Sequence, residues 1–371
     1  MKKLKLLSLV FLAVSFISCQ LTYENITPKV NKITGENSFS SINDVAIDSK
    51  NNIYINTRDY LNKYSIKKIT DKNIFSNVIT LENIYRDNSS ENIDGDYKNA
   101  LLGENGFSKI KYYEKDDSIY FYDTNYFYGT TKNNFGYKPL IRKIDKNGYI
   151  STIIKTYDNS QLDFYIIKQK LYFSKITSVI SDDNKNNRSN IEIFDENNKL
   201  FLSKNVPYIW GNMYLFDNNN KLDFYFLGYY SDDNFINIRY LDNQLNIQSK
   251  SETKLLFYIN DLGDIYIIDT FIHHNEVDAK IRVILPFLGK VRESISEFFE
   301  KIKTKEKAKL YKIKKNELLE TLKNKENLTL DNKYLIGDLD IEDISNFTVS
   351  NKGNFLIVFN YNEIYKVNIG G

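Results

Sequence analysis

Apolar and polar residues alternate along most of this chain in a unit that recurs six times. Each unit holds an alternating apolar segment, a turn of Asp, Asn, Lys or Gly, and a second segment rich in Ile, Tyr and Phe. Alternation with a period of two on either side of a polar turn is typical of a β-hairpin. The six predicted hairpins begin at Asp44, Lys109, Asp163, Met213, Leu255 and Phe347.

A second hairpin pattern follows most of these units, beginning at Leu140, Ile191, Ile236 and Lys309. Two consecutive hairpins make a four-stranded sheet. Its apolar faces stay uncovered unless several such sheets pack around one axis. The pattern therefore predicts an all-β fold, a six-bladed β-propeller over residues 41–371.

The last unit offers three strands, the third over Glu363 to Ile369. An open sheet edge invites unwanted pairing, so a closed ring needs a fourth strand from elsewhere in the chain. The segment from Tyr23 to Ile33 precedes the first unit and has no other assigned partner. We expect it to complete the last blade.

A helical pattern interrupts the fifth unit after Pro286, over about residues 286–306. Its apolar residues recur at helical spacing and form one face, which is the mark of an amphipathic helix. They are Leu288, Val291, Ile295, Phe298, Phe299 and Ile302. A propeller does not need this insertion. The apolar face is expected either to pack on the ring itself or to bind a protein partner.

The first eighteen residues have the pattern of a secretory signal peptide. Three lysines precede an apolar run from Leu6 to Ile17, which is too short to span a bilayer as a helix. The run ends in Phe16-Ile17-Ser18-Cys19, which resembles the lipobox of bacterial lipoproteins. That resemblance implies cleavage between Ser18 and Cys19, and a lipid on the Cys19 sulfur that anchors the protein to a membrane. Residues 19–40 would then form the lipidated N-terminus and the closing strand.

Composition and charge limit the possible disulfides and the possible partners of the chain. Cys19 is the only cysteine, so a disulfide within the chain is excluded. Removal of residues 1–18 takes away three lysines and no acidic residue, which moves the formal charge from +2 to −1. No overall positive field remains to favour nucleic acid as a partner.

The second unit resembles the NHL repeat of β-propellers. The resemblance rests on Asp94-Gly95, Ala100 to Leu102, Phe107, Tyr122-Asp123, Ile141-Arg142-Lys143-Ile144-Asp145, Gly148 and Ile150-Ser151-Thr152. It covers about sixty residues, whereas the other units keep only the hairpin pattern. The resemblance implies a propeller built of repeated four-stranded blades.

Few residues are candidates for a catalytic or metal-binding site. Most Asp and Asn residues fall in predicted turns, where their side chains bond to local backbone. The only two histidines, His273 and His274, are neighbours that would point to opposite sides of an extended chain. No GxSxG, P-loop or Rossmann pattern occurs. We therefore assign no catalytic residue, no metal site and no cofactor. The lysine-rich run from Lys301 to Lys315 is expected to be a solvated surface, with membrane headgroup contact as the alternative.

These observations favour a lipid-anchored binding or scaffold protein of the cell envelope, at the outer membrane, with a protein partner and no catalytic role. At the level of fold alone, this plan is similar to the propeller lipoprotein of the outer-membrane protein assembly machinery. The alternative is a propeller hydrolase or lactonase that holds a metal ion at the axis.

Overall fold

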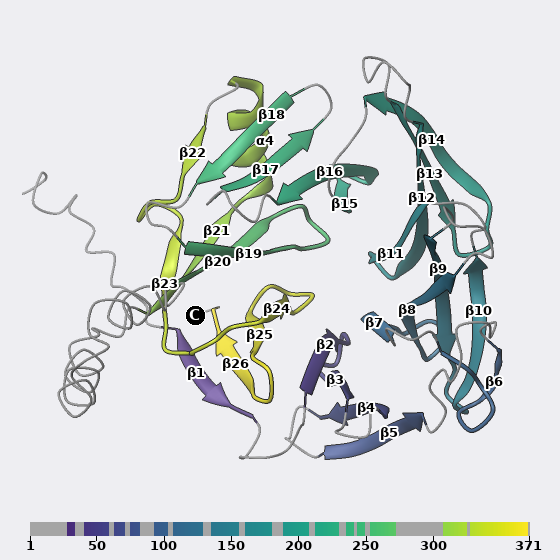
Figure 1. Cartoon of the computed structure of the whole chain (residues 1–371). Helices are drawn as coiled ribbons and strands as arrows, with labels where there is room; N and C mark the ends of the chain where they lie inside the picture. The colour runs from purple at the N-terminus through teal and green to yellow at the C-terminus, as the bar shows by residue number, and fades with distance from the viewer. Residues whose placement is uncertain are drawn as a thin grey trace, which may run out of the picture.

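In a computed structural model of the chain, sheets stand around a common centre, each with one edge strand turned inward (Figure 1). The structure describes residues 28–33, 41–58, 63–70, 75–81, 93–102, 107–128, 135–155, 160–179, 188–207, 212–229, 235–240, 243–248, 253–271, 307–324 and 327–369. The predicted signal peptide, with Ser18 and Cys19, lies outside these residues. So do His273, His274 and the predicted helix over 286–306, with its apolar face at Leu288, Val291, Ile295, Phe298, Phe299 and Ile302.

The described residues form six sheets, which confirms the predicted six-bladed propeller. The first three sheets follow one another along the chain. The first holds β2 (Ser41–Ile47), β3 (Ile53–Arg58), β4 (Tyr64–Ile69) and β5 (Phe75–Leu81). The second holds β7 (Phe107–Tyr113), β8 (Ser118–Tyr128), β9 (Phe135–Ile144) and β10 (Tyr149–Lys155), with the short β6 (Gly95–Asp96) on its outer edge. The third holds β11 (Gln161–Ile167), β12 (Lys170–Val179), β13 (Arg188–Asp195) and β14 (Leu200–Pro207).

The other three sheets each combine strands that are not consecutive in the sequence. The fourth holds β15 (Asn212–Asn218), β16 (Lys221–Tyr229), β17 (Phe235–Tyr240), β18 (Asn243–Gln248) and the later β22 (Leu328–Thr329). The fifth holds β19 (Thr253–Ile259), β20 (Ile265–Phe271), β21 (Ala308–Ile313) and β23 (Leu335–Leu339). The sixth holds β24 (Asn346–Val349), β25 (Phe355–Phe359), β26 (Ile364–Asn368) and β1 (Lys29–Lys32).

The ring closes where the sequence pattern placed its closure. Strand β1 pairs antiparallel with β26, with Lys29 opposite Asn368 and Val30 opposite Val367. The backbone N–H of Ile33 also donates to the carbonyl of Ile364 at 2.9 Å. The expectation that an N-terminal segment completes the last blade is thus confirmed over Lys29–Lys32.

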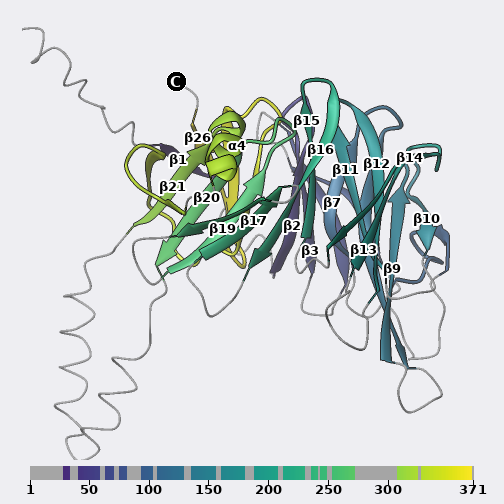
Figure 2. The ribbon, with the colours of Figure 1, turned by 90° about the horizontal axis from the view of Figure 1, so that it is seen from above.

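Hydrophobic cores hold the ring together, one between each pair of neighbouring sheets in the described part of the chain. The core between the sixth and first sheets joins Phe359 and Ile364 to Ile42 and Ile55, so burial and strand pairing close the ring together. Alternation along each strand supplies apolar side chains to both faces, and each face packs on a neighbour. Figure 2 shows that β2, β7 and β11 run in a common direction, as strands that line one axis must.

Asparagine and aspartate build the hairpin turns, as the sequence indicated. Asn219 and Asn220 both have left-handed backbone, with φ of 55° and 68°, as a two-residue hairpin turn requires. In the turn after β9, Asp145 Oδ1 accepts hydrogen bonds from the N–H groups of Asn147 and Tyr149, at 2.8 and 2.9 Å. These side chains are occupied by local backbone, which fits the interpretation of them as turn formers.

The prediction of a second hairpin beginning at Lys309 is wrong. Strand β21 is followed by the helix α4 (Lys315–Asn324), and the fourth strand of the sheet is supplied later by β23. Leu318 and Leu322 lie one helical turn apart, and both are fully buried in the core between the fourth and fifth sheets. The residues of α4 are mostly good helix formers, and Asp264 Oδ1 accepts the N–H of Lys315 at 3.0 Å. Helix propensity and an available apolar surface therefore prevail over the short alternating pattern.

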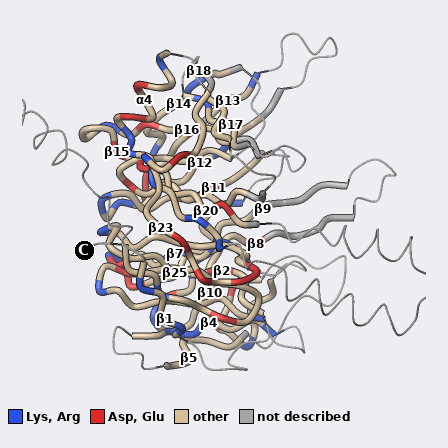
Figure 3. The backbone as a smooth tube through the Cα atoms, turned by 90° about the vertical axis from the view of Figure 1, so that its left-hand side faces the viewer, with Lys and Arg blue, Asp and Glu red and all other residues tan. Residues whose placement is uncertain are grey.

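The chain after α4 adds a strand to the preceding blade. Strand β22 pairs in parallel with β18, with Leu328 opposite Ile247, so the outer edge of the fourth sheet is covered by a segment inserted in the fifth. No helix in the described ranges is both long and apolar enough to cross a membrane. Basic and acidic residues are found side by side along the described chain (Figure 3).

Candidate binding site at the centre of the ring

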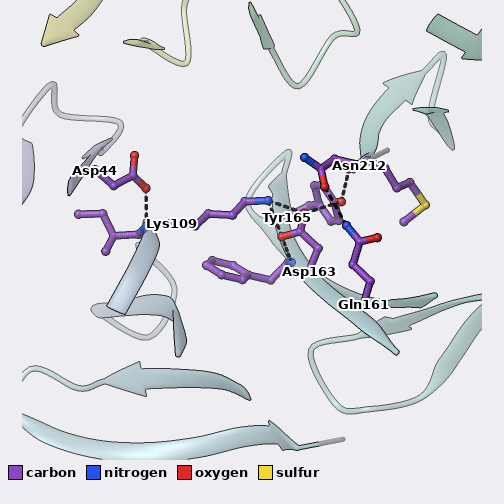
Figure 4. Close-up of polar contacts among 9 residues, drawn as sticks. Asp44, Lys109, Gln161, Asp163, Tyr165 and Asn212 are labelled. Atoms are coloured by element: carbon purple, nitrogen blue, oxygen red, sulfur yellow. Dashed lines mark hydrogen bonds and ion pairs between the residues drawn. The ribbon is translucent and has the colours of Figure 1, made fainter. Parts of the chain in front are cut away.

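Polar side chains meet at the centre of the ring from four of its innermost strands. They are Asp44 on β2, Lys109 on β7, Gln161, Asp163 and Tyr165 on β11, and Asn212 on β15, which together we call the axial cluster (Figure 4). Alternation explains the contribution of β11. Residues 161, 163 and 165 share one face of the strand, while Leu162 and Phe164 are buried on the other.

Two β-bulges aim side chains into the cluster. One interrupts β2 between Ile42 and Asp44, and the other interrupts β7 between Ser108 and Ile110, at Lys109. Lys109 has a φ of 49°, a left-handed conformation that costs free energy in a residue with a side chain. Asp44 Oδ2 accepts the N–H of Ile110 at 2.7 Å, so the two bulges are joined. A bulge redirects the side chains around it, and here it turns Lys109 toward the axis.

Lys109 and Asp163 form an ion pair at the middle of the cluster. The Lys109 ammonium donates to both oxygens of the Asp163 carboxylate. That carboxylate also accepts the N–H of Phe164 at 2.7 Å and the hydroxyl of Tyr165 at 2.9 Å. The Lys109 nitrogen lies 5.1 Å from the centre of the Tyr165 ring, within cation–π range. The pair is thus held from several sides.

The ion pair is surrounded by protein and still reaches solvent. Burial lowers the pKa of Lys109, and the neighbouring Asp163 opposes that change. Yet 36% of the Lys109 side chain and 13% of the Asp163 side chain are accessible. Burial also raises the pKa of Asp44 to about 6, although the N–H groups of Val45 and Ile110 and the two lysines of β7 favour its charged form. Charged groups that are enclosed by protein but accessible to solvent are typical of binding sites.

A second layer lies beside the axial cluster. Lys111 is two residues beyond Lys109 on β7, and its charge stabilises the carboxylates of both Asp44 and Asp261. Burial raises the pKa of Asp261 above its usual value. Tyr258 of β19 interacts with Thr348 of β24 and lies in the field of Asp44. The centre of the ring therefore holds two lysines, Lys109 and Lys111, that interact with three aspartates.

An amide pair stands on the exposed side of the cluster. Gln161 Nε2 donates to Asn212 Oδ1 at 2.8 Å, and both residues are exposed. Asn212 also contacts the hydroxyl of Tyr214, whose pKa is raised by burial. Among the residues that the structure describes, no group of three or more His, Cys, Asp or Glu is arranged to hold a metal ion. The cluster offers hydrogen-bond donors and acceptors of both charges.

The residues that resemble an NHL repeat form a separate polar network around the buried Arg142 in the second sheet. Arg142 is completely buried, and its guanidinium donates to the carbonyls of Leu101 and Ile93 at 2.7 and 2.8 Å. It also pairs with Asp123 at 3.0 Å and with Asp94 at 3.1 Å. Arg142 therefore ties residues 93–102 to the sheet, which is a structural role.

Sequence reasoning did not find the axial cluster. The hairpin pattern gives its members no role beyond turns and strands. The proposed partner-binding residues of the insertion lie outside the described residues. A usable signal was present: Lys109 and Asp163 are charged residues inside apolar alternating segments, at the first strand of their units. What the sequence could not show is that these strands surround one axis.

Comparisons with known proteins assign no family. No protein-family model matches the chain, and no curated protein matches its sequence. Among solved structures, a streptogramin B lyase is similar over 93% of this chain and 99% of its own, with 9% identity and a TM-score of 0.45. A luciferin-regenerating enzyme is similar over 92% and 95%, with 11% identity and a TM-score of 0.41. A gluconolactonase from Xanthomonas campestris is similar over 92% and 90%, with 7% identity and a TM-score of 0.28. None of these similarities assigns an activity to this chain.

Proposed function

We propose that this protein is a lipid-anchored propeller of the cell envelope, at the outer membrane, which acts by binding and not by catalysis. The observation that carries the proposal is the place of β1, the strand that closes the ring. It begins at Lys29, shortly after Cys19 in the sequence. Ten residues span at most about 36 Å when fully extended. A lipid on Cys19 would therefore keep the ring close to the membrane surface, attached through its own closing strand.

The enclosed polar centre supports a binding role. Its Lys109–Asp163 ion pair is still partly accessible to solvent, which suits reversible binding of a ligand. The helical insertion over 286–306 is the proposed site for a protein partner, through the apolar face that includes Phe298 and Ile302. The Arg142 network supports, for the second blade, the proposed kinship with NHL repeats.

The anchor is tested by replacing Cys19→Ser in cells grown with labelled palmitate. We expect the unchanged protein to carry label and to sediment with membranes. The Cys19→Ser variant should lose the label and either become soluble or stay unprocessed. Ser18→Ala is the matched control, because alanine is also small and should permit cleavage and labelling. A correctly cleaved, unlabelled Cys19→Ser protein that remains in the membrane would contradict the anchor.

The binding role is tested against the metal-dependent alternative by elemental analysis and by thermal melting with EDTA. A non-catalytic binder is expected to contain no stoichiometric metal and to melt at the same temperature with and without chelator. Stoichiometric Ca²⁺ and a large loss of stability on chelation would instead favour a hydrolase or lactonase with an axial metal ion.

A further inference from the structure

Charged groups at the centre of the ring already interact with one another, two lysines with three aspartates. Asp163 receives both contacts of the Lys109 ammonium, and Lys111 lies in the fields of Asp44 and Asp261. An anionic ligand would have to compete with Asp163 for Lys109, and a cationic ligand would have to compete with Lys109 for Asp163. Breaking this pair costs free energy, because protein surrounds it on several sides and leaves only part of each side chain accessible. These existing contacts therefore disfavour a charged ligand that would have to break them.

Neutral hydrogen-bonding capacity remains available at the same place. A carboxamide has two donors and an acceptor oxygen, and the Gln161–Asn212 contact uses one donor of Gln161 and the oxygen of Asn212. Both amides are exposed, so water occupies their remaining sites in the free protein. Planar amides and carboxylates side by side match a ligand whose groups donate and accept hydrogen bonds at once, and a hydroxyl does both.

Tyr214, which contacts Asn212, supplies the apolar part of the site. Tyr214, on the next innermost strand, is partly buried and meets the ring of Phe257 edge to face, with centroids 5.6 Å apart. The ring of Tyr165 is buried in the core between the third and fourth sheets. The Tyr214 side chain offers a flat apolar body and a polar hydroxyl, so it can contact the C–H faces of a ligand and its polar edge.

From these observations we infer that the axial cluster, with Tyr214 beside it, binds a neutral polyhydroxylated ligand of the saccharide class. The hydroxyl groups would replace water on Gln161 and Asn212, and the Lys109–Asp163 pair would stay intact. The inference names the ligand class for the binding function proposed above, and it rests on that function. It does not depend on the lipid anchor.

The test uses the complete mature protein in detergent, with D-glucose, N-acetyl-D-glucosamine and maltose as probes. Citrate and putrescine serve as charged comparators. Binding is measured by isothermal titration calorimetry and by the rise in melting temperature with ligand concentration. We expect at least one saccharide to bind, and both charged probes to bind at least tenfold more weakly. Failure of all three saccharides to bind, whether or not citrate or putrescine binds, would overturn the inference.

Variants locate the binding. Gln161→Met removes one amide of the axial cluster, and Gln248→Met is the matched control, because Gln248 is exposed at the end of β18 on the outer part of a blade. Loss of a net hydrogen bond worth about 1 kcal/mol weakens binding roughly fivefold to tenfold. We expect that loss for Gln161→Met and none for Gln248→Met.

A second variant covers the case in which Gln161→Met fails to fold, as judged by circular dichroism. Asn212→Leu changes the other amide, at the exposed beginning of β15, and should weaken saccharide binding to a similar degree. Saccharide binding that both axial variants leave unchanged would overturn the inference. If saccharide binds but Cys19 carries no lipid, the anchor fails and the ligand site stands. If the chain is anchored but binds only charged probes, the ligand class fails and the proposed function stands.

Discussion

Replacement of Arg142 by methionine should destabilise the second blade strongly. The guanidinium uses four of its five N–H groups on Leu101, Ile93, Asp123 and Asp94. Both Arg142 and Asp123 have fully buried side chains. Removal of one partner from a buried ion pair costs about 3–5 kcal/mol, because the other charge stays behind.

The expected fall in melting temperature follows from chain length. Unfolding entropy is about 2.1 cal/mol/K per residue, or roughly 0.74 kcal/mol/K for a chain of about 350 residues. A loss of 3–5 kcal/mol then lowers the melting temperature by about 4–7 °C. Lysine cannot reproduce four contacts with three donors from one nitrogen, so Arg142→Lys should recover only part of the stability.

Calorimetry and hydrogen exchange together test this reasoning. Asp94 accepts the N–H of Thr152 at 2.9 Å, and Leu101 donates its N–H to Ile93 at 3.0 Å, so both amides should lose protection when Arg142 is removed. Arg188→Met, at an exposed arginine of β13, is the control and should change little. The double change Arg142→Met with Asp123→Leu should be more stable than the single change, because no buried charge is left without the guanidinium. A melting temperature within about 1 °C of the unchanged protein, with both amides still protected, would refute the argument.

Two further predictions concern the centre of the ring and the insertion. The folded-state pKa of Asp44 is raised from 3.8 to about 6, so its stabilising contribution is present below pH 3.8 and is lost as the pH rises through 6. Asp44→Asn keeps an acceptor oxygen for the N–H of Ile110. Urea unfolding should show this variant more stable than the unchanged protein by about 1–3 kcal/mol at pH 8, with no gain at pH 3.5. An equal effect at both pH values would contradict the raised pKa. For the insertion, the double change Phe298→Asp with Ile302→Asp should lower the melting temperature, because about 1.5–3 kcal/mol of burial is lost at each side chain if the ring covers them. An unchanged melt with lost capture of a partner from intact membranes would assign the face to that partner, and no change in either would show that the helix interpretation is wrong.

Local patterns were enough to predict the blades and their closure. Alternation marked the innermost hairpins, and the lack of a fourth strand in the last unit pointed to the N-terminal segment that becomes β1. The same reasoning failed after β21, where a short pattern around Leu318 and Leu322 fits a strand or a helix equally well. Burial of both leucines against the fourth sheet selects the helix. That surface comes from residues distant in the sequence, so no local pattern contains it.

The sequence by itself determined the period of two, the polar turns and the number of units, because these depend on residues within a few positions of one another. It also contained the lipobox-like Cys19 and the residues of the Arg142 network. The tertiary structure alone decided what the charged residues of the innermost strands do. Lys109 and Asp163 are separated by more than fifty residues, and only the closing of six sheets around one axis brings the ammonium against the carboxylate. Bulges in β2 and β7 then turn Asp44 and Lys109 inward, and backbone geometry of that kind is set by strand pairing and not by the side chains alone.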